Sequence, residues 1–171
     1  MSSLTSRTPN ADVRVMSSNI LFDKTLADRL PLIADYYRAS DADLIGMQEV
    51  NRVGTALFET LADLYAPVAL SHADGKHCYT PILYRTDRFD LIEGGSELYR
   101  SRGTDTKSMS WAVVSDKESG KKLALINSHG SLILKHYNLD ATDAVEGELW
   151  RVSFNVCFLI NATDEHWSIV F

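Results

Sequence analysis

Short apolar runs and helical patterns alternate along the first half of the chain. Residues 13–18 mix Val, Met and Ser without clean alternation, which predicts a central strand covered on both faces. Residues 44–50 form a second apolar run that contains a Gln-Glu pair close to its end. A run of this length predicts a strand that places the carboxylate of Glu49 at a sheet edge. Active sites of α/β proteins commonly lie at such edges.

Two segments have the periodicity of amphipathic helices. In residues 31–39, Pro31 suits the first turn of a helix, and apolar residues recur on one side at Leu32, Ile33, Tyr36 and Tyr37. From residue 51 to residue 64 the apolar positions form a second stripe, so we expect a helix that packs flat on the sheet.

The next part of the chain has the pattern of antiparallel strands. Residues 79–85 and 89–93 predict one tight hairpin, and residues 109–115 and 122–128 predict another. Helical stretches followed by hairpins predict an α/β (α+β) fold with mixed, largely antiparallel sheets and outer helices, and not a doubly wound parallel sheet.

The C-terminal part follows a different pattern. Residues 143–159 lie close to a helical stripe, but apolar residues crowd every face towards the end of that segment. We therefore divide the chain into a flexible N-terminus at residues 1–11, a domain at residues 12–151 and an atypical apolar tail at residues 152–171.

Composition narrows the classes of function. The 171 residues suit one domain, and a hydrophobic content of 45% is enough for a core. The net charge of −6 disfavours the basic face that long nucleic acids demand. No apolar run reaches about 18 residues, so no membrane span is expected. Cys78 and Cys157 are far apart in sequence, which favours free thiols in a reducing cytoplasm.

Three polar residues stand at the ends of predicted strands: Asn19, Glu49 and His129. A carboxylate and an amide oxygen are hard ligands suited to Mg²⁺, and a histidine can hydrogen-bond the charge that builds on a phosphoryl group. Each residue also has an ordinary explanation, because Glu49 could favour a helix N-terminus, Asn19 could form a turn and His129 could be a structural imidazole. The hypothesis of a metal-assisted phosphoester site depends on their order and shared placement.

The order of these elements resembles the endonuclease/exonuclease/phosphatase superfamily over about residues 13–151. The matching elements are Ser-Ser-Asn19-Ile, Leu-Ile-Gly-Met-Gln-Glu49-Val, Ile-Leu-Tyr84-Arg and Ile-Asn-Ser-His129. The resemblance implies two packed mixed sheets with outer helices, of which this chain would form half or more of a four-layer α/β/β/α sandwich. It also implies cleavage of a phosphoester, in a small molecule or a nucleic acid, with Mg²⁺ or Mn²⁺.

The resemblance implies a role for each of the three residues. Glu49 matches the metal-ligand Glu of the family, and Asn19 matches the strand-end Asn that helps order the metal shell. Asn19 is therefore a candidate both as a metal ligand and as a catalytic residue. His129 matches the catalytic histidine that contacts the scissile phosphate.

Two further elements of that family do not occur in the sequence. They are a Gly-Asp-x-Asn element, which positions the attacking water, and a late Ser-Asp-His element, which carries the general base. Only 42 residues (171 − 129) follow His129, too few for the strands that bear both. We therefore expect the chain to be an incomplete N-terminal portion, shortened after Arg151. Because a positioned general base contributes about 10²–10⁴ in rate, we expect weak or no activity of this chain alone.

The alternative function is a non-catalytic module that self-associates through an exposed strand edge or through the C-terminal tail. Other polar residues are weaker candidates. His72 and His77 are expected to be solvated loop histidines, with binding of a transition metal as the alternative. A basic loop is expected to be solvated or to meet substrate phosphate through Arg100, Arg102 and Lys107.

Overall fold

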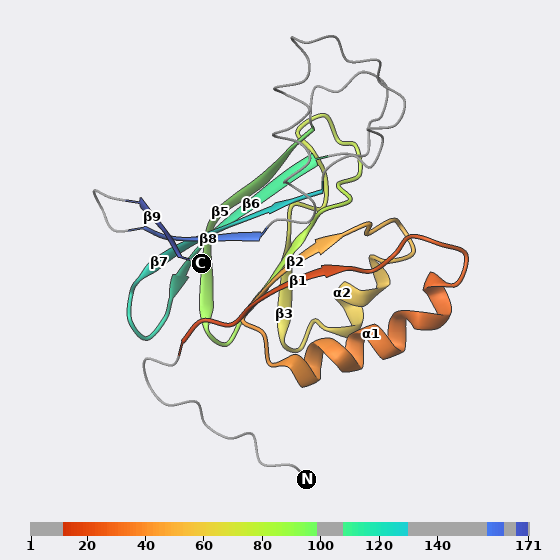
Figure 1. The fold of residues 1–171 in the computed structure, drawn as a ribbon, viewed down its shortest axis with the longest axis horizontal. Coiled ribbons are helices and arrows are strands. Elements are labelled where there is room, and N and C mark those ends of the chain that lie inside the picture. Colours follow the sequence, from red (N-terminus) through yellow and green to blue (C-terminus); the bar gives the residue numbers. More distant parts are fainter. Residues whose placement is uncertain (1–11, 99–107, 130–156, 163–166, 171) are drawn as a thin grey trace, which may run out of the picture.

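The computed structural model describes residues 12–98, 108–129, 157–162 and 167–170, which form two sheets and two helices (Figure 1). The helices are α1 (Leu26–Ser40) and α2 (Ala56–Thr60). One sheet has the strand order β1 (Val15–Asn19), β2 (Leu44–Gln48), β4 (Ile82–Arg85) and β3 (Tyr65–Val68). The other has the order β5 (Phe89–Leu98), β6 (Ser108–Asp116), β7 (Lys122–Ser128), β8 (Cys157–Ala162) and β9 (Trp167–Val170).

The sheets are mixed and largely antiparallel, as the sequence predicts. Strand β1 runs parallel to β2, and every other described pair of neighbouring strands is antiparallel. Both helices lie on the side of the four-stranded sheet that faces away from the five-stranded sheet (Figure 1). The described elements therefore form three layers, helix on sheet on sheet, which confirms the predicted fold class.

Strand β2 is the buried centre of this arrangement, because all five of its residues are buried. Side chains alternate between the two faces of a strand. Ile45 and Met47 pack in the core on the helix side, whereas Leu44 packs in the core between the sheets. Gln48 has the same parity as Leu44 and thus faces the second sheet.

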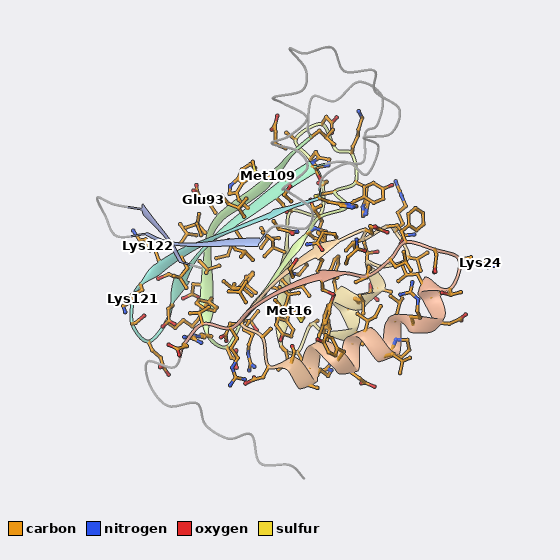
Figure 2. All side chains as sticks on the ribbon, in the orientation of Figure 1. Met16, Lys24, Glu93, Met109, Lys121 and Lys122 are labelled. Carbon is orange, nitrogen blue, oxygen red and sulfur yellow. The ribbon has the colours of Figure 1, made fainter. Side chains whose placement is uncertain are left out.

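Among the described strands, β1 lies at the edge of its sheet and not at the centre that the sequence predicts. Among the described strands it pairs with β2 alone, and Val15 is 37% exposed. Met16 of this strand is partly buried against the helix-side core (Figure 2). The serines of the strand find polar partners, since Gln48 donates to Ser17 and Tyr37 donates to Ser18. The irregular mixture of Val, Met and Ser thus reflects local pairing and not burial on both faces.

The predicted hairpin at residues 79–93 is also wrong. Strand β4 belongs to the first sheet and β5 to the second, so the short link between them crosses from one sheet to the other. Arg88 in this link contacts Asp43 at the start of β2 and Asp116 at the end of β6. A turn pattern shows where the chain reverses but not which sheet the next strand joins. The predicted hairpin of β6 and β7 is confirmed.

Helix α1 begins earlier than predicted and turns a different face inward. It starts at Leu26, so Pro31 lies inside the helix. Leu26 and Tyr37 are buried, whereas Leu32 is 70% exposed and Tyr36 is 62% exposed. The missing N–H of Pro31 removes one backbone bond near the helix start, which α1 tolerates because its buried face extends along its length.

Helix α2 is shorter than the stripe from residue 51 to residue 64 suggested. Leu57 and Phe58 are buried as expected, but Val53 precedes the helix and is 45% exposed. Neither described helix is long and apolar enough to cross a membrane.

The helix predicted over residues 143–159 is wrong where the structure describes it. Residues 157–159 belong to β8, which pairs antiparallel with β7, and residues 143–156 lie outside the described residues. An apolar run without a polar face fits a strand as well as a helix, so periodicity could not decide between them.

Candidate active site

The C-terminal ends of β1 and β2 bring Asn19 and Glu49 to one edge of the first sheet. Because these strands are parallel and Asn19 pairs with Gln48, both strands end at the same level. Glu49 follows immediately with φ +62°, in the left-handed region that residues other than glycine seldom adopt. Such strained backbone is concentrated at functional sites, and here it turns the carboxylate towards Asn19.

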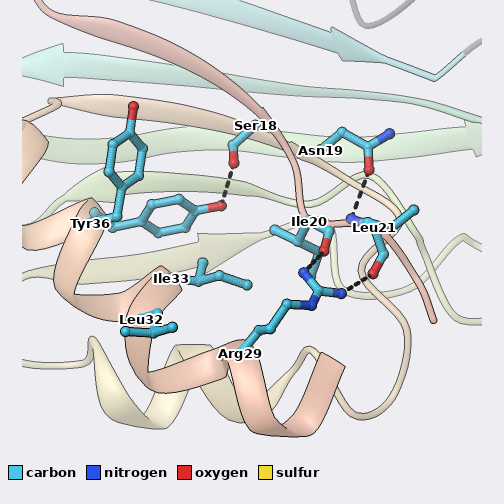
Figure 3. Close-up of a pocket in the computed structure, with 9 residues that line it drawn as sticks. Ser18, Asn19, Ile20, Leu21, Arg29, Leu32, Ile33 and Tyr36 are labelled. Carbon is cyan, nitrogen blue, oxygen red and sulfur yellow. Dashed lines mark hydrogen bonds between the residues drawn. The ribbon is translucent and has the colours of Figure 1, made fainter. Parts of the chain in front are cut away.

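Both oxygens of the Glu49 carboxylate accept hydrogen bonds. The side-chain amide of Asn19 donates to Oε1 over 2.9 Å, and the backbone N–H of Phe22 donates to Oε2 over 2.8 Å. The amide oxygen of Asn19 accepts from the N–H of Leu21 over 2.9 Å (Figure 3). Asn19 thus turns its nitrogen to the carboxylate and its oxygen to the loop, which orients Glu49.

Arg29 of α1 anchors the loop that supplies these backbone donors. Its guanidinium donates to the carbonyl of Ile20 over 2.8 Å and to that of Leu21 over 2.6 Å (Figure 3). The same guanidinium pairs with Asp23 over 3.0 Å. The position of the Phe22 N–H against Glu49 therefore depends on α1 as well as on β1.

His129 reaches the same place from the second sheet. It follows β7, its residue is 7% exposed, and its backbone N–H donates to the carbonyl of Ser108 over 3.2 Å. Its Nε2 lies 3.8 Å from Oε1 of Glu49. The structure thus brings together the three strand-end residues, which are far apart in the sequence.

The donor types suit a hard divalent cation, although they are few. The side chain of Glu49 is 25% exposed, and its carboxylate is the type of ligand that Mg²⁺ prefers. Among the described residues there is no cluster of three or more His, Cys, Asp or Glu that could hold a metal. The amide oxygen of Asn19 could join such a site only if the amide rotated and gave up its bond to Leu21.

Two residues with a central place in this geometry belong to the sequence elements that precede Glu49 and His129, but no role was predicted for them. Gln48 and Asn127 are both fully buried, and the amide of Gln48 donates to the amide oxygen of Asn127 over 2.7 Å. The available signal was a polar side chain at an inward position of each otherwise apolar strand. Buried amides require partners, so such positions predict a specific contact.

His72 and His77 are not the solvated loop histidines that the sequence suggested. His72 is 6% exposed and its Nδ1 lies 2.7 Å from Oγ of Ser96. His77 is half-buried, with Nε2 2.8 Å from the carbonyl of Val50 and its ring edge-on to Tyr79. Each ring is therefore held by its own contacts. Three other candidates lie outside the described residues: Arg100, Arg102 and Lys107.

A pocket of about 250 Å³ lies beside Asn19, between the end of β1 and α1 (Figure 3). Arg29, Ile33 and Tyr36 of the helix form much of its wall. Tyr37, also in the wall, donates its hydroxyl to Ser18 over 2.9 Å, and burial raises its pKa to about 12. The phenol therefore stays neutral at ordinary pH.

Comparison with known proteins finds similarity in structure only. No family model matches the chain, and no curated protein is significantly similar to it in sequence. An endonuclease/exonuclease/phosphatase protein from Bacteroides vulgatus is 24% identical with a TM-score of 0.59, over 71% of this chain and 54% of its own. The mannosyl-6-phosphatase Bt3783 from Bacteroides thetaiotaomicron is 25% identical with a TM-score of 0.59, over 81% and 59%. TDP2 from D. rerio, solved with a single-strand DNA product, is 22% identical with a TM-score of 0.61, over 82% and 54%.

These similarities establish the fold of the chain. It is that of the endonuclease/exonuclease/phosphatase proteins, as the resemblance of the sequence elements implied. The chain spans between 54% and 59% of the length of these three solved proteins.

Proposed function

We propose that this chain, with its endonuclease/exonuclease/phosphatase fold, carries part of a phosphoester hydrolase site that depends on Mg²⁺ or Mn²⁺. The observation that carries the proposal is the Glu49 carboxylate. The backbone of Glu49 has a positive φ, and Oε1 of its carboxylate lies 2.9 Å from the amide nitrogen of Asn19 and 3.8 Å from Nε2 of His129. Three polar groups from two sheets converge there.

Each residue has a distinct role in this proposal. Glu49 holds the cation, and Asn19 orients the Glu49 carboxylate or, after rotation of its amide, adds a ligand oxygen. His129 donates a hydrogen bond to the phosphoryl oxygens of the substrate, where negative charge builds during the reaction. A bound divalent cation would supply charge neutralisation at the phosphate.

The proposed substrate is a phosphoester in a small molecule, ahead of long nucleic acid. The net charge of −6 works against a long polyanion. The structurally similar proteins include both a mannosyl-6-phosphatase and a TDP2 solved with single-strand DNA product, so a short nucleic acid stays within the proposal. We also propose that the protein acts in a reducing compartment such as the cytoplasm. The free, buried thiol of Cys78 is consistent with that compartment.

We expect the activity of this chain alone to be weak or absent. The sequence contains neither the Gly-Asp-x-Asn nor the Ser-Asp-His element. A positioned general base contributes about 10²–10⁴ in rate, and one carboxylate holds Mg²⁺ weakly.

Binding of Mn²⁺, followed by electron paramagnetic resonance, tests the site without requiring turnover. Glu49→Ala should abolish the binding seen with the unmodified chain. Glu59→Ala removes an exposed carboxylate from α2 and should leave the binding unchanged. Equal Mn²⁺ binding by all three proteins would overturn the proposed cation site.

Hydrolysis of bis-p-nitrophenyl phosphate with Mg²⁺ tests the expected activity on the same proteins. We expect little or no turnover by the unmodified chain. A clear rate that Glu49→Ala abolishes would support the hydrolase site and would show that the chain is catalytically competent.

Self-association is the second candidate function, favoured by an unpaired strand edge and exposed apolar side chains. Among the described strands β1 has a partner on one side alone. Val15 of β1 and Leu32 and Tyr36 of α1 are exposed. Light scattering over a range of concentrations should show a dimer that Tyr36→Lys weakens. A monomer at every concentration would contradict this function.

A further inference from the structure

Gln48 and Asn127 form a polar link between the two sheets. Nε2 of Gln48 donates to Oδ1 of Asn127 over 2.7 Å, and both residues are fully buried. Alternation along each strand explains why they meet. Gln48 shares the parity of Leu44, and Asn127 shares that of Leu125, and both of these leucines pack in the core between the sheets.

The neighbours of the two amides fix their orientations. The amide nitrogen of Asn127 lies 2.7 Å from the carbonyl oxygen of Met47 and 3.0 Å from that of Thr80. The amide nitrogen of Gln48 also lies 3.1 Å from Oγ of Ser17. Turning either amide over would set oxygen against oxygen, so each has one acceptable orientation.

The pair is not explained by stability alone. Within the described part of the chain, Oε1 of Gln48 is buried without a hydrogen-bond partner. Burying a polar atom without a hydrogen bond lowers the stability of the fold, and an apolar side chain of similar size would not have this cost. A residue that keeps this cost in the middle of a core points to a requirement for a specific geometry.

Apolar packing between two sheets is non-directional and fixes their relative position only loosely, whereas a buried hydrogen bond has a defined length and angle. Gln48 immediately precedes Glu49, and Asn127 lies two residues before His129. We infer that Gln48 and Asn127 are positioning residues that set the distance between Glu49 and His129. The effect of that distance on cation binding and catalysis rests on the function proposed above. The positioning of His129 relative to Glu49 does not depend on that function.

The ring resonances of His129 report that geometry directly and need no metal. They are followed by ¹H–¹³C NMR and assigned with His129→Gln. Gln48→Met removes the Gln48–Asn127 hydrogen bond and leaves the Asn127 amide on the carbonyl of Met47. It should broaden or double these signals because the side-chain bond no longer holds the sheets in one relative position. Gln48→Asn keeps an amide but shortens the side chain, so it should have the same effect if Gln48→Met does not fold.

Two control variants separate loss of the link from local or global disturbance. Ser17→Ala removes the other side-chain partner of Gln48 and leaves the link intact. Tyr65→Phe removes a buried hydrogen bond, to the carbonyl of Ala42, at the opposite end of β2. Both should keep single, sharp His129 signals.

Binding of Mn²⁺ separates failure of this inference from failure of the proposed function. Loss of Gln48 should weaken Mn²⁺ binding by about 10–100-fold, the usual effect of removing a group that orients a metal ligand. If the His129 signals of the Gln48 variants match those of the unmodified chain, the inference is overturned, whatever the Mn²⁺ result. If those signals change but the unmodified chain binds no Mn²⁺, the positioning role stands and the proposed cation site fails.

Discussion

Nε2 of His129 lies 3.8 Å from Oε1 of Glu49, at the point where the ends of β2 and β7 meet. Glu49 follows β2 of the first sheet, and His129 follows β7 of the second. The relation between the two residues is thus a relation between two sheets, and any site built on them depends on how the sheets pack.

His129→Ala should lower any Mg²⁺-dependent hydrolysis by about 10²–10³-fold, because it removes a donor to the phosphoryl oxygens. Its Mn²⁺ affinity should stay close to that of the unmodified chain, since Glu49 is intact. His77→Ala, which removes a half-buried histidine bonded to the carbonyl of Val50, serves as the control. A loss of Mn²⁺ binding by His129→Ala as complete as that of Glu49→Ala would contradict the division of roles.

Asn19→Ala should weaken Mn²⁺ binding by about 10–100-fold, because the carboxylate of Glu49 loses the amide that orients it. Asn51→Ala is the matched control. It removes a nearby amide whose oxygen accepts from the N–H of Gly54. Titration with Mn²⁺ measures both variants, and equal affinities would argue against a role for Asn19.

Arg88→Met should lower the free energy of unfolding by roughly 3–5 kcal/mol, because it leaves two buried carboxylates without their cation. The guanidinium lies 2.8 Å from the fully buried Asp43 and 3.0 Å from Asp116. Urea denaturation measures the loss. As a control, Arg14→Met removes an exposed pair with Asp41 and should cost about 1 kcal/mol or less. Similar losses in the two variants would show that the buried ion pairs of Arg88 stabilise the fold no more than the exposed pair of Arg14 does.

Asp116 should make stability fall in acid. Burial by itself would raise the pKa of Asp116, but hydrogen bonds from the N–H of Ser119, from Arg88 and from the N–H of Glu118 outweigh it and lower the pKa below 3.8. A lowered pKa in the folded state means that the stabilisation is present above the ordinary pKa and is lost as the pH falls through the folded value.

Asp116→Asn tests this pH dependence. The unmodified chain should be more stable than the variant at about pH 7, and the difference should narrow below about pH 4. Urea denaturation at several pH values measures it. A difference that stays constant down to about pH 2 would contradict the proposed role of the charge.

The sequence by itself determined the local features of this protein. Apolar runs of strand length located β2 and the hairpin of β6 and β7, and they located Asn19, Glu49 and His129 at strand ends. These features follow from residues close together in the chain, because strand alternation and turn chemistry act over a few positions.

The tertiary structure alone decided which strands are neighbours and which residues meet. It placed β4 and β5 in different sheets, left β1 with one described neighbour, and joined Gln48 to Asn127. No local pattern encodes these outcomes. They depend on which faces can bury apolar area together, and on which buried polar groups then find a partner.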